Sequence, residues 1–244
     1  MRGRTPRVPV EPYAAGAARA RVRPRAAPPR SPGTTTADGP HSAVGHAGAV
    51  PDRGLHPLLA GRWSPTVFDA ADEVGAAEVE LLLEAARWAP SAGNSQPWAF
   101  VVGRRGDATH RRLVRHLAGS SARWAPTAGL LVANLCHRLV EDTDWEYSEF
   151  ALYDLGQAVA HLTVQARALD LHVRQFRAFD RAGVAAEFGV PAHWEVTTMA
   201  AVGRLPAGSA APGPAPETDR RRRAVDDLLW PTGAAGTHAV SDER

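Results

Sequence analysis

Apolar residues recur along the chain with two spacings, which predict helices in some segments and strands in others. Residues 76–88 place Val79, Leu82 and Ala86 three or four positions apart, the spacing of one helix face. Pro90 then ends this helix, because proline lacks the N–H that the next turn needs. We therefore expect a helix over residues 76–88.

Short apolar runs without helical spacing predict buried strands, and amphipathic stretches predict further helices. Asp180 is a suitable N-cap for a helix that ends near Gly189. Helices and strands interleave, which predicts a mixed α/β layer architecture. The expected strands are residues 98–103, 129–136, 172–176 and 196–203, and the other expected helices are residues 110–118, 149–169 and 180–189.

The longest predicted helix, residues 149–169, has apolar residues on nearly every side. Phe150, Leu152, Leu155 and Val159 are among them, and they do not fall on a single face. A helix that is apolar on several faces is usually buried on several faces. We expect it to be central in the domain or to contact a second subunit.

The two ends of the chain differ from the middle in amino-acid composition. Residues 1–54 are rich in Ala, Pro, Arg and Gly without any period, so we expect them to be disordered. The alternatives are a basic arm that binds nucleic acid, an export signal, or a start of translation placed too far upstream. An export signal would need an apolar run after the early arginines, and none follows them. Residues 233–244 are also expected to be disordered, which leaves residues 55–232 as the folded domain.

The positive charge belongs to the N-terminal tail. Residues 1–54 contain nine arginines against three acidic residues, whereas residues 55–244 contain 19 arginines against 23 acidic residues. The domain therefore gives no reason to expect a nucleic-acid partner. No uncharged apolar stretch reaches 18 residues, so no membrane span is expected either.

The chain contains no lysine and a single cysteine, and each of these counts excludes certain kinds of catalytic or binding site. Schiff-base catalysis and the lysine of a P-loop are excluded, so arginine must supply any side-chain cation that holds a phosphate. Cys136 cannot form an internal disulfide, which fits a reducing cytoplasm, and its apolar neighbours predict a small buried side chain. The histidines form no H-x-x-x-H pattern, so we expect no metal site. The acidic residues between Glu141 and Glu149 are expected to be a solvated loop and helix start.

The stretch from Pro90 to Trp98, P-S-A-G-N-S-Q-P-W, contains the most informative polar residues. It lies between a predicted helix and a predicted strand, and it holds no acid, base or thiol. Its backbone N–H groups and neutral side chains suit a ligand rich in neutral donors and acceptors, such as the pyrimidine edge of a flavin. On composition alone, an ordinary helix-to-strand turn is the favoured interpretation.

The motif L-L-E-A-A-R-W-A-P-S-A-G-N-S-Q-P-W-A-F-V-V resembles the signature of the nitroreductase-like FMN-dependent oxidoreductases. Further segments resemble the family's other motifs and occur in the family's order. Before the signature stands G-R-W-S-P-T-V-F-D; after it stand A-L-Y-D-L-G-Q-A-V-A-H-L, R-A-F-D, T-T-M-A-A-V-G and the arginine-rich segment near the C-terminus. The resemblance covers residues 61–230. It implies an α+β fold, a three-layer α/β sandwich with a central, mostly antiparallel sheet and a long central helix at the dimer interface.

The resemblance also implies a cofactor site. The flavin loop corresponds to Pro90, Ser91, Asn94 and Gln96, with contacts that often cross the dimer interface. The loop near the reactive ring nitrogen corresponds to Arg177 and Ala178. The phosphate and ribityl chain of FMN correspond to Arg62, Trp63, Ser64, Arg220 and Arg222.

The implied activity is transfer of hydride from NAD(P)H through bound FMN to a small electron-poor substrate, by a ping-pong mechanism in a homodimer. The resemblance names no catalytic side chain. Some positions depart from the family's pattern: Trp63 and Thr66 stand where basic residues are usual, and Asp170-Leu171-His172 replaces Gly-Leu-Gly. The alternative function is therefore a flavin-binding or flavin-sequestering protein that does not turn over NAD(P)H.

Overall fold

A computed structural model gives the fold of residues 54–209 and 222–230. The predicted tail over residues 1–54 lies outside these described residues except for Gly54, and the predicted tail over residues 233–244 lies entirely outside them. Arg220 is outside them as well.

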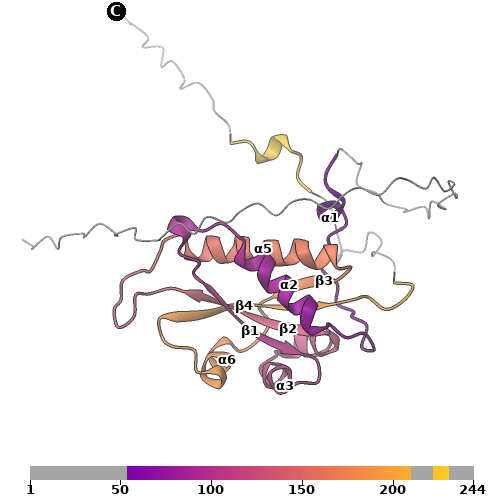
Figure 1. Cartoon of the computed structure of the whole chain (residues 1–244), viewed down its shortest axis with the longest axis horizontal. Coiled ribbons are helices and arrows are strands. Elements are labelled where there is room, and N and C mark those ends of the chain that lie inside the picture. The colour runs from indigo at the N-terminus through magenta and orange to yellow at the C-terminus, as the bar shows by residue number, and fades with distance from the viewer. Residues whose placement is uncertain (1–53, 210–221, 231–244) are drawn as a thin grey trace, which may run out of the picture. The chain divides into compact units, whose positions relative to one another are not determined.

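Four antiparallel strands form the sheet at the centre of the domain (Figure 1). They are β1 (Trp98–Arg104), β2 (Leu130–His137), β3 (His172–Phe176) and β4 (Trp194–Gly203), in the order β1-β2-β4-β3. β2 lies inside the sheet and is buried along its whole length up to Cys136, as its unbroken apolar run predicts. β1 and β3 are the two edge strands.

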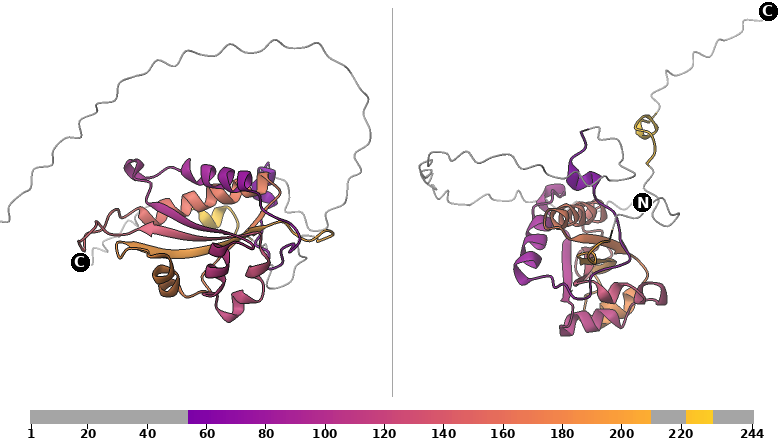
Figure 2. Two further views of the ribbon diagram at one scale, coloured as in Figure 1. Left: turned by 60° about the horizontal axis from the view of Figure 1, so that its bottom comes forward. Right: turned by 90° about the vertical axis from the view of Figure 1, so that its right-hand side faces the viewer.

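Helices cover both faces of this sheet, as the two orientations in Figure 2 show. On one face lie α2 (Ala76–Arg87) and α5 (Ala151–Ala168), and on the other lie α3 (Ala108–Val114) and α6 (Arg181–Phe188). Each face has its own apolar core, one including Leu82 and Leu162 and the other including Leu113 and Met199. The predicted three-layer α+β sandwich is confirmed.

The remaining helical elements are short. The α-helical ones are α1 (Pro57–Ala60) and α4 (Gly119–Ala122), and the 3-10 turns are η1 (Ala92–Asn94), η2 (Ala125–Thr127) and η4 (Asp226–Leu228). Among the described residues, no helix combines the length and the apolar character that crossing a bilayer requires.

Capping residues set the ends of two helices beside the sheet. Asp180 accepts a hydrogen bond from the N–H of Gly183 at 3.0 Å, and Gly189 ends α6 with φ of 62°, so the predicted boundaries of this helix are confirmed. Asp107 caps α3 through the N–H of His110, so α3 begins at Ala108, two residues before the predicted start. It also ends at Val114, four residues before the predicted end.

α5 buries one side and exposes another in the single protomer. Leu155 and Val159 are buried, whereas Leu152 and Tyr153 are 42% and 69% exposed. The prediction that this helix is buried on several faces is therefore wrong for the single protomer. Its expected contact with a second subunit stays a prediction.

Candidate functional site

The turn that joins α2 to β1 has an unusual backbone. Gly93, Asn94 and Gln96 have φ angles of 59°, 56° and 47°. This left-handed region is uncommon for residues other than glycine. The N–H of Gln96 donates to Ser91 Oγ at 3.0 Å, and Gln96 Nε2 donates to Asn94 Oδ1 at 3.3 Å. The side chains of the motif therefore hold its own backbone in place, and Asn94 is exposed at the tip.

Two residues from outside the motif also hold this turn. Asp154 of α5 is 2% exposed, and its Oδ2 accepts a hydrogen bond from the N–H of Ala92 at 3.0 Å. The hydroxyl of Tyr147 donates to the carbonyl oxygen of Ser95 at 3.2 Å. Sequence reasoning missed both residues. The signal for Asp154 was a carboxylate inside an otherwise apolar helix, which has to find a buried partner.

Tyr147 is fixed by a stack of aromatic rings. The imidazole of His137 lies between Tyr147 and Trp194, with ring centroids 3.8 and 4.7 Å away and interplanar angles of 21° and 7°. His137 ends β2 and Trp194 begins β4, so the sheet itself positions the tyrosine. The turn is thus connected to the central layer of the fold.

A hollow of about 290 Å³ opens beside this turn. Exposed aromatic side chains from the start of α5 form one wall, and the turn forms the other. The lining residues are Pro90, Ser91, Ala92, Phe150, Tyr153, Asp154 and Gln157.

The predicted phosphate segment lies along the edge strand β3. Arg62 Nη1 donates to Ser64 Oγ at 3.3 Å, and Arg174 of β3 donates from Nη1 to the carbonyl oxygen of Ser64 at 2.8 Å. The Trp63 ring packs against His172, which begins β3. The segment is thereby attached to the sheet at two points. Arg174 was not predicted, because nothing in the sequence indicates that β3 runs beside residues 62–64.

His172 is neutral in this environment. Burial, reinforced by the charge of Arg167, lowers the pKa of the imidazole to about 4. Arg167 Nη1 lies 2.9 Å from Nε2, and because arginine can only donate, Nε2 must accept and the proton must be on Nδ1. Trp63 therefore packs on an uncharged ring.

The loop after β3 is anchored from one side. The carbonyl oxygen of Ala178 accepts hydrogen bonds from the N–H of Ala118 and the hydroxyl of Ser121. Within the described part of the chain, the N–H of Ala178 donates to no acceptor. Arg177 is exposed beside it. A fixed, unused donor of this kind suits a ligand atom that accepts a hydrogen bond.

The structure brings some predicted site residues together and separates others. Arg62, Ser64 and Arg177 lie at the β3 edge, while the turn containing Asn94 precedes β1 at the opposite edge. The antiparallel pairing points the N-terminal end of β1 and the C-terminal end of β3 in the same direction along the sheet. Three strand spacings separate the edges, which is about 14 Å. Arg222 is exposed in the segment 222–230.

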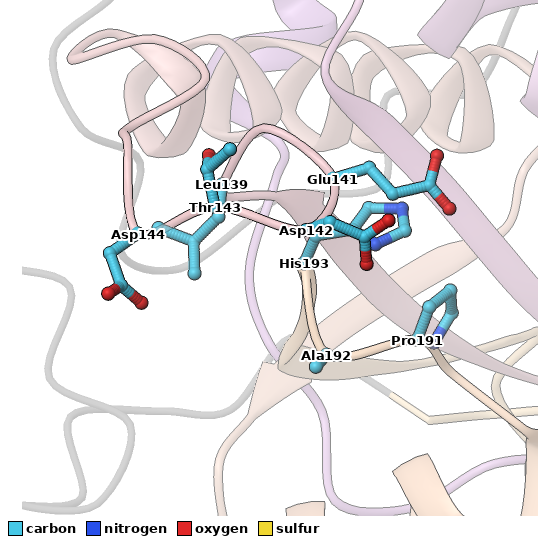
Figure 3. Close-up of a pocket in the computed structure, with 8 residues that line it drawn as sticks. All are labelled: Leu139, Glu141, Asp142, Thr143, Asp144, Pro191, Ala192 and His193. Atoms are coloured by element: carbon cyan, nitrogen blue, oxygen red, sulfur yellow. The ribbon is translucent and has the colours of Figure 1, made fainter.

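A second hollow, of about 420 Å³, lies between the loop after β2 and the start of β4 (Figure 3). None of the predicted site residues lines it. Its acidic side chains come from one loop, and Asp144 points away from the other lining residues (Figure 3). Among residues 54–209 and 222–230, no three His, Cys, Asp or Glu side chains gather as metal ligands would.

Comparison with known proteins agrees with this architecture. Residues 59–131 match the model of the nitroreductase family. A solved oxidoreductase containing FMN is 24% identical, with a TM-score of 0.65 over 76% of this chain and 95% of its own. A nitroreductase family protein from Clostridium difficile 630 is 18% identical, with a TM-score of 0.58 over 72% of this chain and 97% of its own. An FMN-dependent nitroreductase from Clostridium difficile R20291 is 19% identical, with a TM-score of 0.52 over 64% and 90%.

The chain thus has the nitroreductase fold, and its resemblance to the nitroreductase family is confirmed. The matched region runs from α1 into β2 and contains both Arg62 and the turn at residues 90–97. Cys136 is fully buried, as predicted, and burial raises the pKa of its thiol to about 11.

Proposed function

We propose that this chain is a member of the nitroreductase family that binds FMN and reduces a small electron-poor acceptor at the expense of NAD(P)H. The family match over residues 59–131 and the FMN-containing proteins of the same fold support this proposal. A cytoplasmic location fits the single, buried thiol.

The residues at the β3 edge fit the phosphate end of FMN. Arg62 donates to Ser64 there, and Arg220 and Arg222 are the further arginines that we assign to the phosphate. Guanidinium forks bind a phosphate dianion through charge-assisted hydrogen bonds. A chain without lysine has no other permanent side-chain cation to offer.

The residues near the ends of β1 and β3 fit the ring of the flavin. The N–H of Ala178 and the turn at residues 91–96 supply neutral hydrogen-bonding groups, which orient a ring without taking part in proton transfer. FMN held there would supply the hydride chemistry between the nicotinamide and the acceptor. The protein's part is to position both reactants in turn in one slot and to keep water out.

The observation that carries the proposal is the separation of the two halves of the site in one protomer. The turn at Asn94 and the loop at Arg177 lie at opposite edges of the sheet. In a homodimer, the turn of one copy would face the β3 edge of the other and complete the site. The exposed Trp88, Phe150 and Tyr153 supply the apolar surface for such a contact.

An anaerobic titration of the purified protein with NADH and NADPH tests the activity. We expect a yellow protein whose absorbance near 450 nm is bleached by one or both nicotinamides and restored by an electron-poor acceptor. A yellow protein that is not bleached would support flavin sequestration, which the absence of a cation at Trp63 favours. A colourless protein that takes up no added FMN would overturn both functions.

Mixing two variants tests the shared site. Arg62→Ala should damage the phosphate end of the site and Asn94→Ala the ring end, so each homodimer has two defective sites. After subunit exchange, half of the dimers are mixed, and each mixed dimer has one site with both defects and one intact site. We expect FMN binding to return to about one quarter of the wild-type sites. No recovery in dimers shown to exchange would mean that both residues act within one protomer.

A further inference from the structure

A partly buried arginine on β3, outside every predicted motif, stands next to the phosphate segment. Arg174 Nη1 donates to the carbonyl oxygen of Ser64 at 2.8 Å, and the guanidinium carbon lies 5.2 Å from the centroid of the Trp124 ring. These two contacts hold the guanidinium group in one place. Its side chain therefore needs little reorganisation to bind a ligand.

The charge of Arg174 has no acidic partner in the described residues. Most partly buried arginines of the domain pair with carboxylates: Arg204 with Asp72 and Glu78, and Arg112 with Glu187. Arg174 forms no such ion pair within residues 54–209 and 222–230, and its Nε is buried there without a hydrogen-bond acceptor. A half-buried cation without a counter-ion is unfavourable unless an anion binds beside it.

A second guanidinium group reaches the same residue. Arg62 Nη1 contacts Ser64 Oγ while Arg174 contacts the Ser64 carbonyl, although the two arginines are far apart in sequence. Two cations that meet at one exposed serine form a site for a small, doubly charged anion. A phosphate monoester has the charge and the acceptor oxygens to use both forks.

We propose that Arg174 is a binding residue for the phosphate group of the flavin cofactor and that it sets the preference of this site for FMN over riboflavin. This inference rests on the proposed function. Riboflavin has the same ring and ribityl chain but no phosphate, so the ratio of the two affinities isolates the interaction with the phosphate.

Flavin-free protein titrated with FMN and with riboflavin, followed by quenching of flavin fluorescence, tests the assignment. We expect Arg174→Gln, which keeps a donor but loses the charge, to weaken FMN binding about 10- to 100-fold. Riboflavin binding should stay unchanged. Arg111→Gln is the matched control, because Arg111 is an exposed arginine that also donates to a backbone carbonyl, that of Gly106.

Arg174→Lys distinguishes the loss of the positive charge from a loss of folding, because lysine retains the cation and most of the aliphatic stem. We expect it to lose several-fold in FMN affinity, less than the Gln variant, without loss in riboflavin affinity. Folded variants with the wild-type ratio of the two affinities would overturn the assignment. If the wild-type protein binds riboflavin as tightly as FMN, the phosphate site is absent while flavin binding stands. If it binds neither, the proposed function fails and the assignment with it.

Discussion

The indole of Trp63 lies edge-on against the imidazole of His172, with ring centroids 5.6 Å apart and ring planes at 66°. The sequence resemblance implies a basic residue at position 63 and a glycine at position 172, and this chain departs from both expectations. A glycine at position 172 would leave the indole without this partner, so the two departures are structurally linked. The contact attaches the segment containing Arg62 and Ser64 to β3 by packing, without a charge at position 63.

The buried imidazole of His172 makes the stability of the protein depend on pH. Its pKa is about 4 in the folded protein and about 6.5 in an unfolded chain, so between these values the unfolded state binds a proton that the folded state does not. This stabilisation is complete above pH 6.5 and is lost as the pH falls to about 4. Arg167 and Asp170 are the charged groups that also act on the ring.

Denaturant unfolding at pH 7.5 and pH 4 measures this effect in wild type and in His172→Phe. We expect the wild-type free energy of unfolding to fall by about 3 kcal/mol more than that of the variant over this interval. His161→Gln, which changes an exposed histidine of α5, is the control. Equal losses in wild type and His172→Phe would contradict the neutral state of His172.

The carboxylate of Asp154 is expected to hold the turn before β1. In Asp154→Ala the N–H of Ala92 loses its acceptor, and losing this hydrogen bond to a buried carboxylate should cost about 1–3 kcal/mol. Asp154→Asn keeps an acceptor oxygen and should cost less. Urea unfolding gives the loss, and hydrogen exchange at residues 92–96 reports whether the turn is the region that loosens.

Glu149→Ala is the control for Asp154, since Glu149 is exposed and lies near the same end of α5. If Asp154→Ala is as stable as this control and exchange in the turn does not accelerate, Asp154 does not hold the turn.

Gly103 is expected to tolerate no side chain. A Cβ atom there would lie 2.5 Å from the backbone nitrogen of His110, where α3 crosses β1. Because backbone atoms of a capped helix cannot move away, Gly103→Ala should destabilise the protein by at least about 1–3 kcal/mol. Gly119→Ala, which meets no atom within 4 Å, is the control. Similar melting temperatures for the two variants would show that α3 can shift.

A charge on the exposed side of α5 is expected to prevent the proposed dimer. Tyr153 is 69% exposed in the protomer, so Tyr153→Glu should preserve the fold while placing a carboxylate in the contact. We expect sedimentation velocity to show a monomer with weakened FMN binding. Val140→Glu changes another exposed apolar residue and should remain dimeric. If Tyr153→Glu remains a dimer and retains its flavin, the dimer interface does not include this side of α5.

The predicted elements succeeded where local chemistry decides structure. β3 was predicted at its observed boundaries, and Asp180 and Gly189 act as the expected caps of α6. The predicted boundaries of α3 differ from the observed ones, because the N-cap Asp107 precedes the apolar residues on which the prediction was based. The order β1-β2-β4-β3 was not predicted, because strand pairing depends on contacts between distant segments that no local pattern records.

The residues of the candidate site also divide into those that a local motif predicts and those that only the fold reveals. The turn at residues 90–97 is recognisable because its polar residues are adjacent in the chain. Arg174, Tyr147 and Asp154 were missed because each acquires its role through a contact across dozens of residues. Residues that bind through local motifs can be read from one sequence, whereas residues that hold those motifs in place require the fold.

The position of the flavin loop and the phosphate segment at opposite edges of the sheet has a consequence for the amount of protein that a cell must make. If two copies must meet to assemble each cofactor pocket, the fraction of chains able to retain FMN rises with protein concentration. By the same linkage, FMN would then hold the proposed pair together, so a cell short of flavin would contain more separated chains. Dilution would then release cofactor and subunits in one coupled process.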